Sequence, residues 1–182
     1  MLDVIFPSNF YILFKAPNAD ELNSFIESDV NEEYRWYPKW SESCNVKTYQ
    51  LNSNKYLPLL QPSFEVFGTN FNNRFTIDIE DPWLNEYERG SFQEMHSHQC
   101  DFACVYFINS GSNFSQFNFY DRNNVNLSPI CQTITDYQYQ FKPSISAGDI
   151  IFFPGHLLHY VSPHESDVIR KTFSVNLHLN KV

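Results

Sequence analysis

The stretch that decides the fold is GDIIFFPGHLLHYV, which runs from Gly148 to Val161. Its apolar run Ile150–Phe153 predicts a buried strand, because short continuous apolar runs bounded by turn residues are typical of sheet cores. Pro154 ends this strand, since proline has no N–H to donate to a sheet ladder. His159 is therefore expected near the end of a buried strand, where polar groups reach the rim of the sheet.

The sequence around this stretch has the same β character. From about residue 64 onward, short runs rich in Phe, Tyr, Ile and Val alternate with clusters of Asn, Ser, Gly and Pro, which is typical of strands joined by turns. The expected strands are Phe64–Phe67, Phe75–Ile79, Trp83–Tyr87, Phe102–Ile108, Phe117–Tyr120, Tyr137–Phe141, Asp149–Phe153, Tyr160–Val161 and Lys171–Leu179. About eight short strands without intervening helices predict a mainly β fold, a jelly-roll or cupin-like barrel known as a double-stranded β-helix.

The N-terminal third has a different pattern. Residues Asn18–Glu33 predict one helix packed outside the sheet, because Leu22, Phe25 and Ile26 share one helical face. Residues Trp36–Leu60 carry no clear pattern, and residues 121–129 have the composition of an exposed loop. A chain of 182 residues fits a single domain. We expect residues 1–63 to support a barrel core that spans residues 64–182.

Composition and charge narrow the range of partners. The net charge is −9 and the pI is near 5.0, so the chain repels phosphate backbones and is not expected to bind nucleic acid. No apolar run approaches the ~18–20 residues that a membrane span requires. We expect a cytoplasmic protein whose partner is a small molecule or a peptide.

A pair of histidines, His96 and His98, stands just before the apolar run Phe102–Ile108. Residues i and i+2 of an extended chain project from the same face, so both imidazoles can reach one metal ion. His159 is the expected third ligand, and a face of three ligands leaves coordination positions open. The alternative is a pair of surface histidines without a metal.

Arg170 follows His159 by eleven residues and is succeeded by the alternating polar residues Thr172, Ser174 and Asn176. A buried arginine next to hydroxyl groups is suited to bind a carboxylate, because its planar group of donors matches the two oxygens. The alternative for Arg170 is a surface ion pair with Glu165 or Asp167.

Other polar and aromatic residues are expected to be structural. His156 is interpreted as a rim residue and Trp83 as part of the core. The acidic pair Glu80-Asp81 is expected to be solvated, because nothing in the sequence places it where a carboxyl pKa would rise.

Together these motifs resemble a known family. Trp83-Leu-Asn85, His96-Ser-His98, Phe119-Tyr-Asp-Arg122 and the stretch from Gly148 to Asn176 occur in the order seen in 2-oxoglutarate and Fe(II)-dependent oxygenases similar to prolyl hydroxylases. Members of that family are encoded by bacteria and marine phages, so the resemblance implies a bacterial or phage-infected host. It covers about the last hundred residues.

The resemblance implies Fe(II), 2-oxoglutarate and O2 as cofactor and cosubstrates. Carried over to this sequence, it makes His96 and His159 iron ligands and makes Arg170 the partner of the distal 2-oxoglutarate carboxylate, with Ser174 in support. The implied reaction hydroxylates a C–H bond of a peptide, an amino acid or another small substrate, and releases succinate and CO2.

Two positions depart from the family pattern. Position 98 is usually a carboxylate, so the metal could be held by three imidazoles including His98, by Asp101 in place of His98, or by two histidines and water. A tyrosine that often completes the cosubstrate pocket is Phe107 here, and Tyr87, or Tyr106 in another strand register, could replace it. The alternative functions are a metal-binding cupin and a non-enzymatic jelly-roll module that binds a partner or builds a structure.

Overall fold

The computed structural model describes residues 9–123, 126–136 and 138–182. The helices are α1 (Ala19–Asp29), η1 (Glu32–Tyr34), α2 (Lys39–Cys44), α3 (Ser53–Gly68) and α4 (Pro129–Thr135). The strands are β1 (Ile12–Lys15), β2 (Arg35–Trp36), β3 (Val46–Gln50), β4 (Phe75–Ile79), β5 (Trp83–Tyr87), β6 (Gln93–His96), β7 (Phe102–Phe107), β8 (Phe117–Tyr120), β9 (Gln140–Phe141), β10 (Asp149–Pro154), β11 (Leu158–Val161) and β12 (Arg170–Lys181).

The strands form two antiparallel sheets, which confirms the predicted mainly β fold of the double-stranded β-helix type. The large sheet has the order β1-β10-β7-β12-β5-β3-β2, with β4 paired to β12, and the small sheet has the order β6-β11-β8-β9. Strand β12 is central, because it pairs with β7 and β5 along one half and with β4 along the other. Strands β1 and β3 come from the N-terminal third and complete the large sheet.

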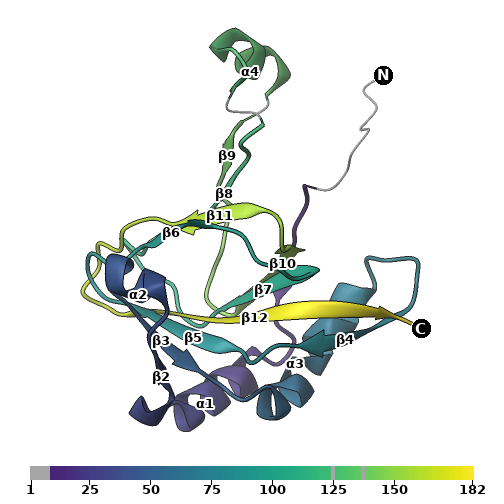
Figure 1. Ribbon diagram of the computed structural model, residues 1–182, viewed down its shortest axis with the longest axis vertical. Coiled ribbons are helices and arrows are strands. Elements are labelled where there is room, and N and C mark those ends of the chain that lie inside the picture. The colour runs from purple at the N-terminus through teal and green to yellow at the C-terminus, as the bar shows by residue number, and fades with distance from the viewer. Residues whose placement is uncertain (1–8, 124–125, 137) are drawn as a thin grey trace.

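Strand alternation sorts the core into two layers. On β10, Ile150 and Phe152 pack with the helices, whereas Ile151 and Phe153 pack between the sheets. The same rule applies to β7 and β12, because successive side chains of a strand point to opposite faces. Helices α1 and α3 lie on the side of the large sheet that faces away from the small sheet (Figure 1). The prediction of helical packing outside the sheet is therefore confirmed.

The strand predicted at Phe64–Phe67 is wrong, because these residues form the last turns of α3. The buried residues Tyr56, Leu60, Phe64 and Phe67 are spaced by four, four and three positions, which is a helical period. Two prolines, Pro58 and Pro62, lie inside this helix and hide the pattern, since proline in a helix interior removes a backbone hydrogen bond.

Smaller differences concern element ends. The helix predicted to reach Glu33 ends at Asp29, because Val30 takes an extended conformation, and η1 follows. The strand predicted at Tyr137–Phe141 is reduced to Gln140–Phe141, and Tyr137 lies outside the described residues. Strands β8 and β9 extend from the barrel as an arm that leads to α4 (Figure 1). No helix in the described part of the chain is long and apolar enough to cross a membrane.

Candidate metal and cosubstrate site

Three histidines, from two neighbouring strands and the loop that follows one of them, converge between the sheets. His96 ends β6 and pairs with His159 of β11, and His98 follows two residues later, where its backbone N–H donates to Gly155 O at 2.7 Å. Each imidazole offers one nitrogen, and the three nitrogens lie within 4.8 Å of one another. Within residues 9–123, 126–136 and 138–182, this is the one such group of three or more potential ligands. The structure thus brings together the three histidines that the sequence suggested.

The hydrogen bonds of the three rings fix their tautomers. The Nδ1 atoms lie 2.7 Å from Glu94 O for His96, 2.8 Å from Asn176 Oδ1 for His98, and 3.0 Å from Leu157 O for His159. Carbonyl and amide oxygens accept and do not donate, so each Nδ1 carries the proton. In a neutral imidazole the lone pair then belongs to Nε2.

Burial keeps these rings neutral. Desolvation lowers the pKa of His96, lowers the pKa of His98 to about 4, and lowers the pKa of His159 further below its usual value. The Nε2 atoms of His98 and His159 are 3.3 Å apart. With both protons on Nδ1, these two nitrogens cannot hydrogen-bond to each other, and two lone pairs face a common space. The donor set therefore fits a divalent transition metal, which neutral imidazoles bind well.

Arg170 lies at the start of β12 and is 4% exposed. Its guanidinium sits over Tyr87 at 4.7 Å and over Phe107 at 5.7 Å from the ring centroids. Among the described residues, no hydrogen-bond partner is found for its buried Nη1. The ion pair considered for Arg170 does not form with Asp167, which instead accepts from Arg89 at 2.8 Å. A buried guanidinium with an unused donor is suited to an anionic ligand.

Arg170 and the histidines line one space, the histidine cavity. Thr172 and Ser174 also line the cavity, because alternate residues of β12 share a face with Arg170. Tyr87 lines it as well, and its hydroxyl donates to Gln93 at 2.8 Å. The cavity measures about 20 Å³, so binding a five-carbon diacid there requires lining side chains to shift. The chemistry of the cavity fits such a ligand, because the guanidinium of Arg170 and the hydroxyls of Thr172 and Ser174 lie on β12, which also lines the space next to the histidines.

Two candidate residues lie elsewhere. Tyr106 is on the opposite face of β7, where its hydroxyl donates to Ala19 O at 3.0 Å and Asn23 Oδ1 at 2.8 Å, so its prediction as a cosubstrate residue is wrong. Asp101 is exposed, and its carboxylate accepts from Leu179 N at 2.8 Å. Asp101 is therefore held against β12 and does not join the histidine group.

Sequence reasoning missed the contacts behind His98. Glu80 is exposed, as expected, but its carboxylate also accepts a hydrogen bond from Asn176 Nδ2 at 2.7 Å. Burial alone would raise the pKa of Glu80, but hydrogen bonds from His178 and Asn176 outweigh it and lower that pKa. Trp83 stacks on His98 with ring centroids 5.9 Å apart. The run of alternating polar residues that ends at Asn176 indicates a polar strand face, but it carries no signal that Glu80 lies against that face.

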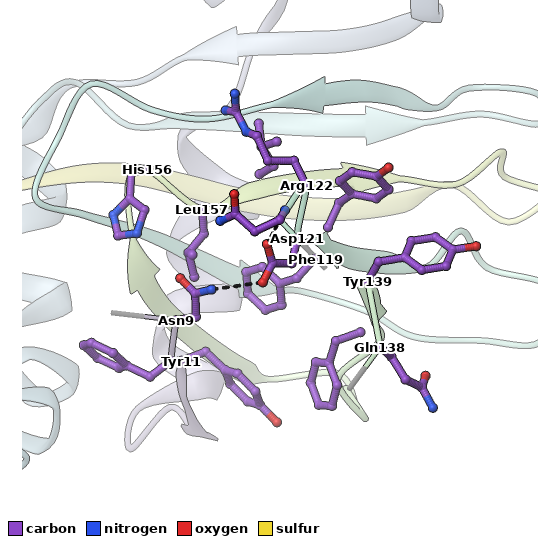
Figure 2. Close-up of a pocket in the computed structure, with 14 residues that line it drawn as sticks. Asn9, Tyr11, Phe119, Asp121, Arg122, Gln138, Tyr139, His156 and Leu157 are labelled. Carbon is purple, nitrogen blue, oxygen red and sulfur yellow. Dashed lines mark hydrogen bonds between the residues drawn. The ribbon is translucent and has the colours of Figure 1, made fainter. Parts of the chain in front are cut away.

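A larger hollow, the aromatic groove, lies beside this site. It measures about 710 Å³ and is lined by Asn9, Phe10, Tyr11, Phe119, Tyr120, Asp121, Arg122, Asn123, Gln138, Tyr139, Phe141, His156, Leu157 and Leu158. Figure 2 shows Asn9 donating to Asp121 across it, at 3.3 Å, with Tyr11, Phe119 and Tyr139 around them. The exposed His156 also lines a shallow hollow that contains His98, so the groove leads toward the histidines.

Comparisons with known proteins agree with this geometry. The family model described as "Putative 2OG-Fe(II) oxygenase" matches residues 81–176. A search of curated proteins found no match.

Solved structures share the fold. A 2OG-Fe(II) oxygenase family oxidoreductase from Burkholderia pseudomallei is 12% identical, with a TM-score of 0.68 and coverage of 92% of this chain and 84% of that one. HygX from Streptomyces hygroscopicus, solved with nickel, 2-oxoglutarate and hygromycin B, is 8% identical, with a TM-score of 0.66 and coverage of 96% and 84%. A Pseudomonas putida prolyl-4-hydroxylase is 14% identical, with a TM-score of 0.57 and coverage of 94% and 93%. Because the family model covers more than half of the sequence, the chain belongs to the 2OG-Fe(II) oxygenases, enzymes that use Fe(II) and 2-oxoglutarate.

Proposed function

We propose that this enzyme is a hydroxylase in which His96, His98 and His159 hold Fe(II) through their Nε2 atoms. The observation that carries the proposal is the common tautomer of the three rings. Each Nδ1 atom lies within hydrogen-bond distance of an oxygen, one nitrogen of each ring lies within 4.8 Å of the other two, and the Nε2 atoms of His98 and His159 are 3.3 Å apart. A chance group of surface histidines would not share one hydrogen-bond pattern, one location between two sheets and lowered pKa values.

Arg170 is proposed to bind the distal carboxylate of 2-oxoglutarate. Ser174 pairs with Trp83, and Trp83 stacks on His98, so Ser174 lies near the histidine end of the cavity. Arg170 is four residues away on the same strand, or ~13 Å at 3.3 Å per residue. A five-carbon dianion is shorter than this backbone separation, so we propose that the long side chain of Arg170 reaches along the strand to one carboxylate while the other end of the dianion lies near the histidines. The hydroxyls of Thr172 and Ser174 can donate hydrogen bonds along its length.

Bound Fe(II), with 2-oxoglutarate and O2, supplies the oxidising power to hydroxylate a C–H bond with release of succinate and CO2. The residues of this chain orient and protect that chemistry. The three Nδ1 hydrogen bonds hold the imidazoles in place, and the guanidinium neutralises a carboxylate that the apolar walls cannot solvate. The apolar residues Val105, Phe117 and Val161 line the cavity and exclude water.

The aromatic groove is proposed to bind the substrate, which we expect to be a peptide, an amino acid or another small molecule. Its volume lies within the ~300–1,000 Å³ that is common for small-molecule sites. Aromatic walls and a few amide and carboxylate groups provide apolar contact together with hydrogen bonds that set orientation. We also propose that residues 1–182 act as one domain, with residues 1–63 supporting a core of residues 64–182.

The test is a calorimetric titration of anaerobic Fe(II)-loaded protein with 2-oxoglutarate, followed by measurement of succinate formation in air. We expect one Fe(II) per chain, 2-oxoglutarate binding that depends on the metal, and slow succinate release without added substrate. Metal binding without 2-oxoglutarate binding would instead support a cupin, and binding of neither would support a non-enzymatic jelly-roll module.

A further inference from the structure

We infer that Glu80, acting through Asn176, sets the tautomer and orientation of His98 as a metal ligand. The inference rests on the proposed function, since it concerns one of the three proposed ligands. Neither Glu80 nor Asn176 belongs to the group of three nitrogens, so both are positioning residues.

The argument begins with the polarity of the hydrogen bonds. Asn176 donates through Nδ2 to Glu80 Oε2 at 2.7 Å, and its Oδ1 lies 2.8 Å from His98 Nδ1. An ionised carboxylate only accepts hydrogen bonds, so the amide must turn its NH2 group toward Glu80 and its oxygen toward His98. That oxygen in turn requires a proton on Nδ1 of His98. The charge on Glu80 therefore leaves the lone pair of His98 on Nε2, which faces His159.

His98 needs this second residue more than the other two histidines do. His96 and His159 direct their Nδ1 protons to backbone carbonyls, which can only accept. The acceptor for His98 is a side-chain amide, which offers either an oxygen or an NH2 group according to its rotation. If the amide turned over, its NH2 would favour a lone pair on Nδ1 and a proton on Nε2, and that tautomer cannot bind a metal through Nε2.

Position 98 is a histidine here, whereas the family pattern has a carboxylate. This difference explains why His98 needs the support of Asn176 and Glu80. A carboxylate ligand has two equivalent oxygens and no tautomers, whereas an imidazole has two nitrogens that differ in protonation. The supporting residues are well anchored. Glu80 N donates to Asn176 O at 3.1 Å, and the second carboxylate oxygen of Glu80 lies 2.9 Å from His178 Nε2.

The same strands provide a matched control. Asn180 Nδ2 donates to Asp78 Oδ2 at 2.8 Å. This contact is an amide–carboxylate pair of the same kind, in which the asparagine lies four residues after Asn176 and the carboxylate lies two residues before Glu80. Asp78 pairs in register with His178 at the backbone, and the Asn180–Asp78 pair lies outside the group of three histidines. Asp78→Asn therefore removes a similar exposed charge and a similar hydrogen bond without altering the contact behind His98.

The first measurement is histidine ¹⁵N NMR of the metal-free protein, which distinguishes Nδ1–H from Nε2–H tautomers without requiring activity. We expect His98 to be Nδ1–H in the wild type and in Asp78→Asn, and to be a mixture of tautomers in Glu80→Gln. Fe(II) affinity, measured by anaerobic titration, should fall about tenfold in Glu80→Gln and stay within about twofold of wild type in Asp78→Asn.

The second measurement uses the double variant Glu80→Gln/Asn176→Asp, which moves the carboxylate from position 80 to position 176. The new carboxylate accepts from His98 Nδ1, and the new amide at position 80 can donate to it. We expect this double variant to recover the Nδ1–H tautomer and most of the Fe(II) affinity, which a merely structural role would not predict. A single variant with an unchanged tautomer, or a double variant no better than Glu80→Gln, would overturn the inference. Failure of the wild type to bind Fe(II) would overturn the proposed function but would leave the tautomer result standing.

Discussion

The histidine cavity and the aromatic groove lie next to each other but differ in size and in chemistry. The cavity is about 20 Å³ and is lined by buried residues of regular strands, including Arg170, Thr172 and Ser174. The groove is about 710 Å³, and half-exposed aromatic residues from separate segments surround it. An invariant cosubstrate can be bound by a small site with a constant set of side chains, whereas a substrate site has to match a particular molecule. The difference supports the proposal that the cavity determines the chemistry and the groove determines the specificity.

The largest effect is expected when a proposed ligand in the cavity is removed. In His159→Ala, Fe(II) affinity should fall by more than ~100-fold, because loss of a ligand exceeds the 10- to 100-fold effect of residues that only support one. Succinate formation should be lost with it. Anaerobic Fe(II) titration measures the first quantity and a coupled assay the second, with thermal unfolding as a check on folding.

His156→Ala is the control for this variant, because His156 is exposed and lines the groove. It should retain Fe(II) binding. Equal loss of iron in the two variants would contradict the division between cavity and groove.

The next largest effect concerns the other polar part of the cavity. Arg170→Lys keeps the charge but loses the planar group of donors, and a hydrogen bond to a charged group contributes ~1.5–3 kcal/mol. The affinity for 2-oxoglutarate should therefore fall roughly 10- to 150-fold, while Fe(II) binding is retained. Calorimetric titration of the Fe(II)-loaded variant with 2-oxoglutarate measures the first quantity, and anaerobic Fe(II) titration measures the second.

A matched change at the surface is Arg89→Lys, because Arg89 is exposed and pairs with Asp167. It should leave the affinity for 2-oxoglutarate unchanged. An Arg170→Lys variant that binds 2-oxoglutarate as wild type does would show that Arg170 is not the carboxylate partner.

Burial of the histidines predicts a pH dependence of stability in the metal-free protein. Burial lowers the folded-state pKa of His98 to about 4, whereas a histidine in the unfolded chain titrates near ~6.5. Between these values the unfolded chain binds more protons, so the free energy of unfolding falls as the pH decreases from 6.5 toward 4. His98 alone should contribute a loss of roughly 2 kcal/mol between about pH 7 and pH 5.

Urea unfolding of the metal-free protein at the two pH values measures this loss, and His98→Gln should reduce it. A free energy of unfolding that stayed constant or increased on acidification would mean that the rings are solvated and that the cavity is open to water.

The smallest effect is expected in the groove. Phe141→Ala removes an aromatic side chain that is 50% exposed, and exposed substitutions usually change stability by less than ~0.5 kcal/mol. Fe(II) affinity, 2-oxoglutarate affinity and substrate-independent succinate formation should therefore stay within about twofold of wild type. A loss of 2-oxoglutarate affinity as large as that of Arg170→Lys would show that the groove and the cavity form one site.

The parts of the site that could be predicted depend on short-range patterns. His96 and His98 are two residues apart, and Arg170, Thr172 and Ser174 alternate on one strand, so the period of an extended chain places each set on one face. The same period explains why Tyr106 does not line the cavity. Its neighbours Val105 and Phe107 face the space between the sheets, so Tyr106, one position away on β7, faces the helices. The barrel was predicted correctly because many short strands share one composition, while prolines concealed α3.

The remaining parts depend on contacts between distant residues. Glu80 and Asn176 are separated by 96 positions, and nothing in either local sequence indicates that they meet. The groove combines residues near position 10 with residues near 120, 140 and 157, so its existence depends on the complete topology. Pairing between distant segments is set by the packing of both sheets and not by the pattern of any one strand.

Strand β12 has a consequence for the order of folding. It carries Arg170, Ser174 and Asn176, and it pairs with β4, β5 and β7, which lie about 70 to 100 positions earlier in the chain. Contacts across such separations form slowly, because the entropy of closing long loops is lost before the contacts are gained. The site should therefore assemble late in folding. Before β12 pairs, the chain would lack both Arg170, the proposed carboxylate partner, and Asn176, the proposed support of His98, so the unfinished site would bind a redox-active metal less tightly.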